Sequence, residues 1–131
     1  MVQFTVGELA KRTGVSKVSI RYYEKCGLLP KVNRRQSGYR IYSEDVIHRI
    51  HFIKNAQLVG FALEEIHELL ALQESPQGTS QQVKSRTMEK LNSIYEKITS
   101  LQWIANTLKK LVTSCDGKVP LADCPILRGL Y

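Results

Sequence analysis

Two cysteines near the end of the chain are close enough in sequence to act together. Cys115 and Cys124 bracket the eight residues DGKVPLAD, and Pro125 follows directly. A catalytic nucleophile is disfavoured there because no His lies in the loop or its flanks to act as a base. From these residues alone, a disulfide or redox switch, a pair of buried thiols and a thiolate metal site all remain open.

The donor atoms of this loop limit which metal ions it could bind. Zinc prefers four ligands drawn from Cys, His and carboxylates, but the three histidines of the chain lie far from the loop in sequence. Two soft thiolates suit a low-coordinate soft ion such as Cu(I), with Ag(I) and Au(I) as analogues. Such a site keeps a negative charge, which the amides of a short helix starting at Pro125 would stabilise.

A second group of residues, in the first half of the chain, could bind a polyanion. Residues 1–60 contain 11 Lys/Arg and 4 Asp/Glu, whereas residues 61–131 contain 8 of each, so the net charge of +7 lies in the first half. Lys and Arg neutralise phosphates, and tyrosine hydroxyls hydrogen-bond to phosphate oxygens. We predict a DNA interface formed by Ser16, Lys17, Arg21, Tyr22, Arg34, Arg35, Tyr39, Arg40 and Tyr42.

The segment before residue 43 is expected to form a helix-turn-helix and a wing. Thr5 and Glu8 have capping-box spacing, Gly14 permits a tight turn, and Ser16 can cap a second helix that ends near Lys25. The N-terminal end of such a helix normally enters the major groove, where Arg can bind guanine. A turn at Ser37-Gly38 predicts a short β-hairpin after it.

Two more helices are expected to complete this module. Ser43 can cap a third helix, and Gly60 separates it from a fourth. Tyr23 shares a face with Ile20 and is expected in the core, and Cys26 is interpreted as a small packing residue. The predicted apolar positions of the two later helices are Val46, Ile50, Ile53 and Leu58, then Leu63, Ile66, Leu69, Leu70 and Leu72.

A long helix follows a linker at residues 73–78. Neither Pro nor Gly occurs over residues 81–114, a span of roughly 50 Å as a helix. Apolar residues form two interleaved heptad series, which is typical of a coiled coil. We expect this helix to pair with a second copy of the chain, because a module this small cannot cover it. The two series are Leu91, Ile98, Ala105 and Val112, and Ile94, Leu101 and Leu108.

Other classes of protein are disfavoured by composition. The sequence has no apolar run long enough for a transmembrane helix and no apolar segment of a secretory signal near Met1, so we expect no membrane partner. The chain is expected in a reducing cytoplasm. Nothing in its residues indicates an enzyme.

The stretch from GVSKVSIRYYE to ALEEIHELL resembles the MerR family of bacterial transcription regulators, with the motifs IRYYE, GLL, GYRIY and GF-x-L-x-E-I. The resemblance covers essentially the whole chain. It implies a mainly α fold with a winged helix-turn-helix, an antiparallel coiled-coil dimer and a C-terminal effector site. It also implies that the dimer distorts promoter DNA when the effector binds, so that RNA polymerase engages both promoter elements.

Within the family, the segment SPQGTSQQVKSRTMEKL and the pattern C-x8-C-P-I-L resemble the copper-efflux regulator (CueR-like) branch. Divalent-ion sensors carry a third Cys at the start of the long helix, where this chain has Ser80. The resemblance therefore implies a monovalent ion, with Ser80 beside the metal as a neighbour and not as a ligand. The loop is one residue longer than is typical of copper sensors and matches mercury sensors, so Hg(II), Zn(II), Cd(II) or Pb(II) stays open.

These inferences combine into one hypothesis: a homodimeric regulator in which Cys115 and Cys124 bind a metal, most simply Cu(I). We assign residues 1–72 to DNA binding, 73–78 to a linker, 79–114 to dimerisation and 115–131 to the metal loop and a short helix. The alternatives are a regulator of a divalent thiophilic ion, an architectural DNA-binding protein without an effector, and a thiol-redox protein.

Overall fold

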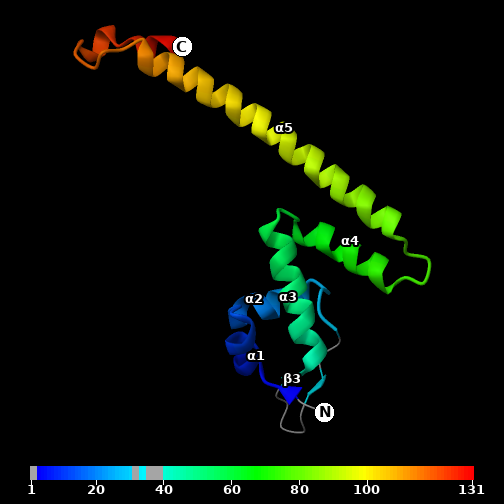
Figure 1. Ribbon diagram of the computed structural model, residues 1–131. Helices are drawn as coiled ribbons and strands as arrows, with labels where there is room; N and C mark the ends of the chain where they lie inside the picture. The colour runs from blue at the N-terminus through cyan, green and yellow to red at the C-terminus, as the bar shows by residue number, and fades with distance from the viewer. Residues whose placement is uncertain (1–2, 31–32, 35–39) are drawn as a thin grey trace. The chain divides into compact units, whose positions relative to one another are not determined.

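The computed structural model describes residues 3–30, 33–34 and 40–131 (Figure 1). Its internal contacts divide the chain into two compact units, Met1–Arg86 and Thr87–Tyr131. The first, which we call the N-terminal unit, holds four short helices and a small sheet. The second, the C-terminal unit, holds most of one long helix and the residues that follow it. The predicted mainly α fold with a helix-turn-helix and a long C-terminal helix is confirmed.

Helices α1 (Val6–Thr13) and α2 (Lys17–Lys25) form the helix-turn-helix. The predicted capping box is present, since the Thr5 side chain accepts from Glu8 N and the Glu8 side chain accepts from Thr5 N. Gly14 ends α1 with a φ of 72°, a left-handed conformation that favours glycine. Ser16 caps α2 by accepting a hydrogen bond from Ser19 N at 3.1 Å.

A three-stranded antiparallel sheet adjoins these helices, in the order β1-β3-β2. Strands β2 (Asn33–Arg34) and β3 (Arg40–Ser43) form the predicted wing, with Asn33 opposite Ile41. The predicted turn at Ser37-Gly38 lies outside the described residues. Strand β1 (Gln3–Phe4) pairs with the other edge of β3 and was not predicted, because two residues are too few to show an alternating pattern.

Helices α3 (Glu44–Leu58) and α4 (Leu63–Glu74) close the core of the N-terminal unit. Most of the predicted apolar positions of the two helices are buried, but Leu58 is 76% exposed and its assignment to the stripe was wrong. Leu58 lies roughly 140° around the helix from Ile53, at about 100° per residue, and therefore faces away from the core. The most deeply buried core side chains are Leu9, Ile20, Leu28, Tyr42, Ile50, Ile53 and Ile66.

The connection into the long helix is short and tightly folded. Helix α4 includes Gln73 and Glu74, so the connection begins later than the predicted linker. A Cβ at Gly78 would lie 2.0 Å from the Leu72 carbonyl oxygen, so no larger residue fits there. Thr79 then caps helix α5 (Ser80–Thr113), since its hydroxyl accepts from Gln82 N at 3.2 Å.

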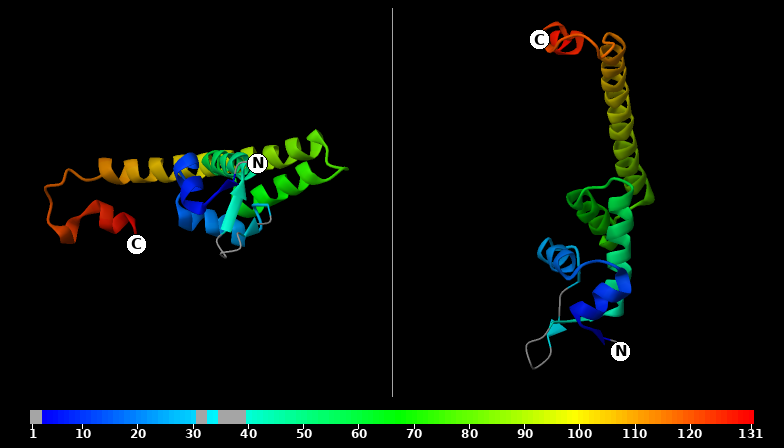
Figure 2. Two further views of the ribbon diagram at one scale, coloured as in Figure 1. Left: turned by 90° about the horizontal axis from the view of Figure 1, so that it is seen from below. Right: turned by 90° about the vertical axis from the view of Figure 1, so that its left-hand side faces the viewer.

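The C-terminal unit has no core of its own. Among residues 87–131, all of which the structure describes, no side chain is buried. After α5 come a 3-10 helix, η1 (Leu121–Asp123), and helix α6 (Pro125–Gly129). Helix α6 turns back beside the last turns of α5 (Figure 2), where a Cβ on Gly129 would meet the Leu111 side chain. Within the described residues, no helix has the length and apolar character needed to cross a membrane.

Candidate nucleic-acid interface and metal loop

Helix α2 divides its side chains between the core and the surface. Ile20 and Tyr23 are buried, and the Tyr23 hydroxyl donates to Gln57 Oε1 at 2.8 Å, as expected of a core residue. The opposite face carries the four predicted DNA contacts of this helix, which are all exposed: Ser16, Lys17, Arg21 and Tyr22. Three of these belong to its first turns, the end that a recognition helix presents to bases.

The wing places some of the other predicted contacts beside α2. Arg34 lies in β2 directly opposite Arg40 in β3. The Arg40 side chain is partly exposed, and its Nη1 donates to Glu24 Oε1 on α2 at 2.7 Å. Arg35 and Tyr39 fall outside the described residues, so their DNA contacts stay a prediction.

Tyr42 is the predicted contact that the structure places elsewhere. Its side chain is only 2% exposed, and its hydroxyl donates to Glu24 Oε2 at 2.8 Å. Burial first, and then the Glu24 carboxylate, raise the pKa of Tyr42 above its ordinary value. A phosphate could reach this hydroxyl only if the ring left the core, so we remove Tyr42 from the proposed interface. The GYRIY motif does not reveal which tyrosine points inward.

Cys26 also differs from expectation. It follows the last residue of α2 and is exposed, so it is not a packing residue. A hydrogen bond with this thiol raises the pKa of Tyr22. The two side chains line a surface hollow together with Leu63 and His67 of α4. The sequence placed Cys26 near the end of α2 but could not give its orientation.

Two side chains near α2 carry no predicted role. Val18 is 77% exposed beside Lys17, where an apolar side chain can contact a thymine methyl group. Lys54 of α3 donates to the Thr13 carbonyl oxygen at 3.5 Å, so it lies at the turn between α1 and α2. Val18 could have been found from the sequence, because it is a valine on an otherwise polar helix face. Lys54 could not, because its position depends on a contact between residues that are distant in the chain.

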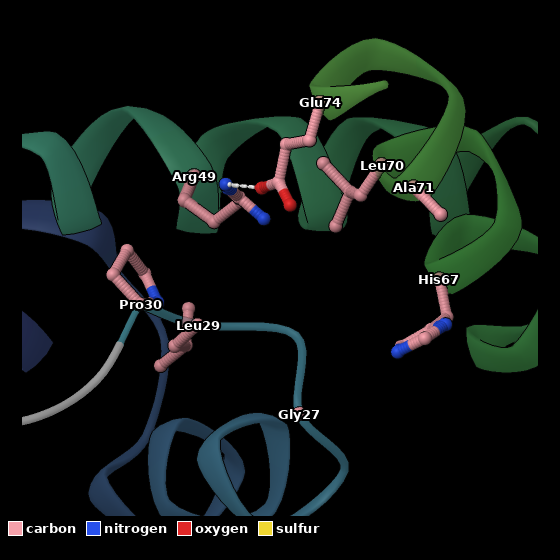
Figure 3. Close-up of a pocket in the computed structure, with 8 residues that line it drawn as sticks. All are labelled: Gly27, Leu29, Pro30, Arg49, His67, Leu70, Ala71 and Glu74. Carbon is pink, nitrogen blue, oxygen red and sulfur yellow. Dashed lines mark hydrogen bonds and ion pairs between the residues drawn. The ribbon is translucent and has the colours of Figure 1, made fainter. Parts of the chain in front are cut away.

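A smaller pocket of about 200 Å³ lies between α4 and the segment after α2 (Figure 3). Arg49 of α3 stands at one end, with its Nη1 donating to the Leu28 carbonyl oxygen at 3.3 Å and its Nη2 paired with Glu74. His67 lies on the opposite side of the pocket. Arg49 therefore joins the end of α4 to the segment that follows the recognition helix.

The C-terminal loop brings Cys115 and Cys124 together. The Cys115 thiol is close enough to contribute to the lowered pKa of Cys124, and Gly117 N donates to the Cys115 sulfur at 3.4 Å. The pKa of Cys124 is lowered, chiefly by the backbone N–H of Leu127. Desolvation opposes this shift, and the backbone N–H of Ile126 and the Cys115 thiol add smaller lowering effects. The start of α6 thus stabilises a Cys124 thiolate, in agreement with the role predicted for a helix at Pro125.

The donor set of the loop consists of two sulfurs. Within the described residues, no group of three or more His, Cys, Asp and Glu side chains is arranged to hold a metal ion. The loop carboxylates bind elsewhere, since Asp116 Oδ1 accepts from Lys118 N at 2.9 Å and Asp123 Oδ1 pairs with Arg128 at 3.3 Å. Ser80 opens α5 and is exposed, and its predicted position near the loop of a partner subunit stays a prediction.

Helix α5 presents an apolar stripe that its own chain does not bury. Ile98, Leu101 and Leu108 are each more than half exposed, as is Val112. These are the predicted heptad positions, spaced as in a helix that packs against another helix. A single chain leaves this surface in water, which is unfavourable for a stripe of this length.

Comparisons with known proteins identify the family of this chain. Residues 4–73 match the family described as MerR HTH family regulatory protein, and residues 47–111 match MerR, DNA binding. The mercuric resistance operon regulatory protein of Bacillus cereus is 38% identical over 129 residues, which are 98% of each chain. The regulator CueR of Escherichia coli O6:H1 is 39% identical over 125 residues, 95% of this chain and 92% of its own.

A solved structure is similar over the full length. The transcription regulator PbrR691 of Ralstonia metallidurans CH34, in complex with lead(II), aligns with a TM-score of 0.90 at 29% identity. The alignment covers 98% of this chain and 99% of that one. The predicted resemblance to the MerR family and its CueR-like branch is confirmed. The chain belongs to the MerR family of helix-turn-helix regulatory proteins, which are DNA-binding transcription regulators and not enzymes.

Proposed function

We propose that this chain is a metal-responsive regulator of the bacterial cytoplasm that activates transcription when Cys115 and Cys124 bind a thiophilic ion, most simply Cu(I). The observation that carries the proposal is that the Cys115 thiol helps to lower the pKa of Cys124 at the start of α6, with no third ligand arranged beside them in the part of the chain that is described. A bound metal ion would supply positive charge and would bridge the two sulfurs.

The two-sulfur donor set is why we place Cu(I) first. Monovalent soft ions accept low coordination by thiolates, whereas zinc generally requires four ligands. A bis-thiolate Cu(I) site keeps one negative charge, and the backbone N–H groups of Leu127 and Ile126 already lower the pKa of Cys124. Ag(I) and Au(I) would bind in the same way. CueR-type relatives that match over nearly the whole chain support this choice.

A divalent thiophilic ion is the second candidate. The loop has the eight-residue length of mercury sensors, one relative is named a mercuric resistance regulator, and the similar solved structure holds lead(II). Such an ion would recruit a further ligand from the partner subunit or from solvent. At the start of α5 this chain supplies Ser80, a poor ligand for a soft ion.

The dimer and the DNA complete the proposal. Two copies pair antiparallel through the α5 stripe, so that each subunit contributes one helix-turn-helix. Each N-terminal unit then contacts promoter DNA with Ser16, Lys17, Arg21 and Tyr22 of α2 and with the basic residues of the wing. Metal binding favours a dimer that distorts the promoter, and RNA polymerase then engages both promoter elements. The interaction with RNA polymerase at the promoter is also part of this proposal.

Anaerobic competition titration of the dimer tests the choice of metal. Cu(I), Ag(I), Hg(II) and Zn(II) are each added against a chelator of known affinity, and promoter transcription is followed in parallel. We expect Cu(I) and Ag(I) to bind one ion per loop and to activate. Tighter binding of Zn(II) than of Cu(I) rejects the Cu(I) assignment, and activation by Hg(II) alone favours the second candidate.

A serine variant tests the site itself. Cys115→Ser should abolish metal activation and leave the DNA affinity of the metal-free dimer nearly unchanged, because the loop belongs to the C-terminal unit. Cys26→Ser is the matched control, since it removes a thiol outside the loop and should leave the metal stoichiometry unchanged. Normal activation of Cys115→Ser would show that the metal is bound elsewhere.

A further inference from the structure

One carboxylate stands inside the basic surface of the N-terminal unit. Glu24 belongs to α2, and residues 1–60 contain only three other acidic residues. An acidic side chain near a DNA interface opposes binding by simple electrostatics. Its presence on the recognition helix therefore calls for a role that offsets this repulsion.

The contacts of Glu24 show what it joins. Its Oε1 accepts from Arg40 Nη1 at 2.7 Å, and its Oε2 accepts from the Tyr42 hydroxyl at 2.8 Å. Both donors come from β3, so one carboxylate on the recognition helix holds two side chains of the wing. The Glu24 side chain is 17% exposed and that of Arg40 is 40% exposed, so the pair is partly shielded from water.

Each of the side chains of Glu24, Arg40 and Tyr42 interacts with the other two. Tyr42 is anchored in the core, and Arg40 also interacts with its hydroxyl. Arg40 therefore contacts Glu24 and Tyr42, while 40% of its side chain stays exposed to solvent. Guanidinium has five donors in a fixed planar fork, so it can bind a carboxylate and a phosphate at once.

We propose that Glu24 is a positioning residue for DNA recognition, which fixes β3 of the wing against the recognition helix and orients Arg40 toward the DNA backbone. The inference rests on the DNA-binding part of the proposed function and is independent of the metal. Orienting Arg40 before binding lowers the entropy lost when the complex forms. The spacing between wing and helix should affect the affinity for a specific site more than the affinity for random DNA, because the protein has no fixed register on random DNA.

The direction in which DNA affinity changes in a Glu24 variant distinguishes a positioning role from simple charge repulsion. Glu24→Gln keeps the size and the acceptor for Tyr42 but removes the charge. If Glu24 only repels DNA, this variant binds all DNA more tightly. If Glu24 positions the wing, the variant binds its specific site less tightly, while binding to random DNA is unchanged or stronger.

The experiment uses the full-length dimer and two duplexes of equal length. One duplex is selected from a randomised library with the wild-type protein, and the other has the same bases in scrambled order. Fluorescence anisotropy measures both affinities at several salt concentrations. We expect Glu24→Gln to lose about fivefold on the selected duplex, the size of one partly shielded ion pair, and nothing on the scrambled one.

Two further variants keep the test decisive. Tyr42→Phe removes one contact of Glu24 without changing charge and should lose about twofold on the selected duplex, which covers the case in which Glu24→Gln does not fold. Glu64→Gln, an exposed carboxylate on α4, is the control for charge removal and should not lower specificity. Circular dichroism confirms that each variant is folded at the temperature of the measurement.

The outcomes distinguish a failure of the proposed DNA-binding function from a failure of the positioning role of Glu24. If the wild-type dimer selects no duplex, the proposed DNA-binding function itself fails. If it selects one, and Glu24→Gln binds that duplex as tightly as the wild type or more tightly, the positioning role is overturned and the function stands. A fall in the ratio of selected to scrambled affinity supports the positioning role.

Discussion

Ile50, Ile53 and Ile66 of the N-terminal unit have no exposed surface, whereas Ile98, Leu101 and Leu108 of the C-terminal unit are each more than half exposed. The same residue types are therefore core in one unit and surface in the other. The N-terminal unit buries its apolar side chains within one chain, and one of its predicted DNA-binding arginines, Arg40, is held by an ion pair with Glu24 of α2. The C-terminal unit leaves its apolar stripe exposed, and the proposed function covers that stripe with a second copy of the chain.

This contrast suits the proposed division of work. A DNA-reading surface must be preorganised, because misplaced side chains lose specificity. A sensing element must respond to its ligand, and regions with few buried contacts have the lowest local stability. The difference between the units predicts different responses to substitution, in the following order of size.

The largest effect is expected at the α5 stripe. Leu101→Lys places a charge at the centre of the proposed helix–helix contact and should give a monomer. Operator affinity should fall about 100-fold or more, because one subunit engages one half-site without the avidity of two. Analytical ultracentrifugation and anisotropy measure the two effects. Ser100→Lys, on the neighbouring position outside the heptad series, is the control and should remain dimeric.

A core truncation in the N-terminal unit comes next. Ile53→Ala should lower the free energy of unfolding by about 2–5 kcal/mol, because it leaves a cavity in a fully buried site. The loss should be the same at low and high protein concentration. Ile98→Ala should instead weaken the dimer, so its effect on the urea midpoint should grow on dilution. Equal concentration dependence for both variants would contradict the contrast between the units.

Arg21→Ala tests the recognition helix. It should lower operator affinity by about 1–3 kcal/mol if Arg21 binds a base, and it should leave the metal-dependent activation ratio unchanged once the site is saturated with protein. Arg128→Ala makes the same change in the C-terminal unit, where Arg128 bonds to Asp123 and the Ala122 carbonyl oxygen. We expect it to leave the DNA affinity of the metal-free protein within about twofold.

The smallest effect concerns alkaline pH. Burial raises the pKa of Tyr23, and burial together with Glu24 raises that of Tyr42. In both cases the unfolded chain loses its proton first, near about pH 10. The stabilising contribution is therefore complete below that pH and is lost as the pH rises toward the folded pKa. Denaturant midpoints between about pH 9 and 11 should fall less steeply for Tyr23→Phe than for the wild type.

Much of the fold could be read from local patterns. The capping box at Thr5, the turn at Gly14 and the unbroken long helix depend on neighbouring residues, and the structure confirms each of them. Strand β1 could not be predicted in this way, because it pairs with residues some forty positions away. The exposure of Leu58, in contrast, follows from its helical spacing from Ile53, so its assignment to the core was an error in reading a local pattern.

For the candidate sites, the sequence by itself determined the chemistry: two thiols and no histidine in one loop, and a basic charge confined to the first half. Tertiary structure alone decided which side chains could use that chemistry. It turned Tyr42 inward, left Cys26 exposed, and brought Glu24 against Arg40 across sixteen residues of sequence. Residue type fixes what an atom can bind, whereas orientation and burial depend on contacts between segments that are distant in the chain.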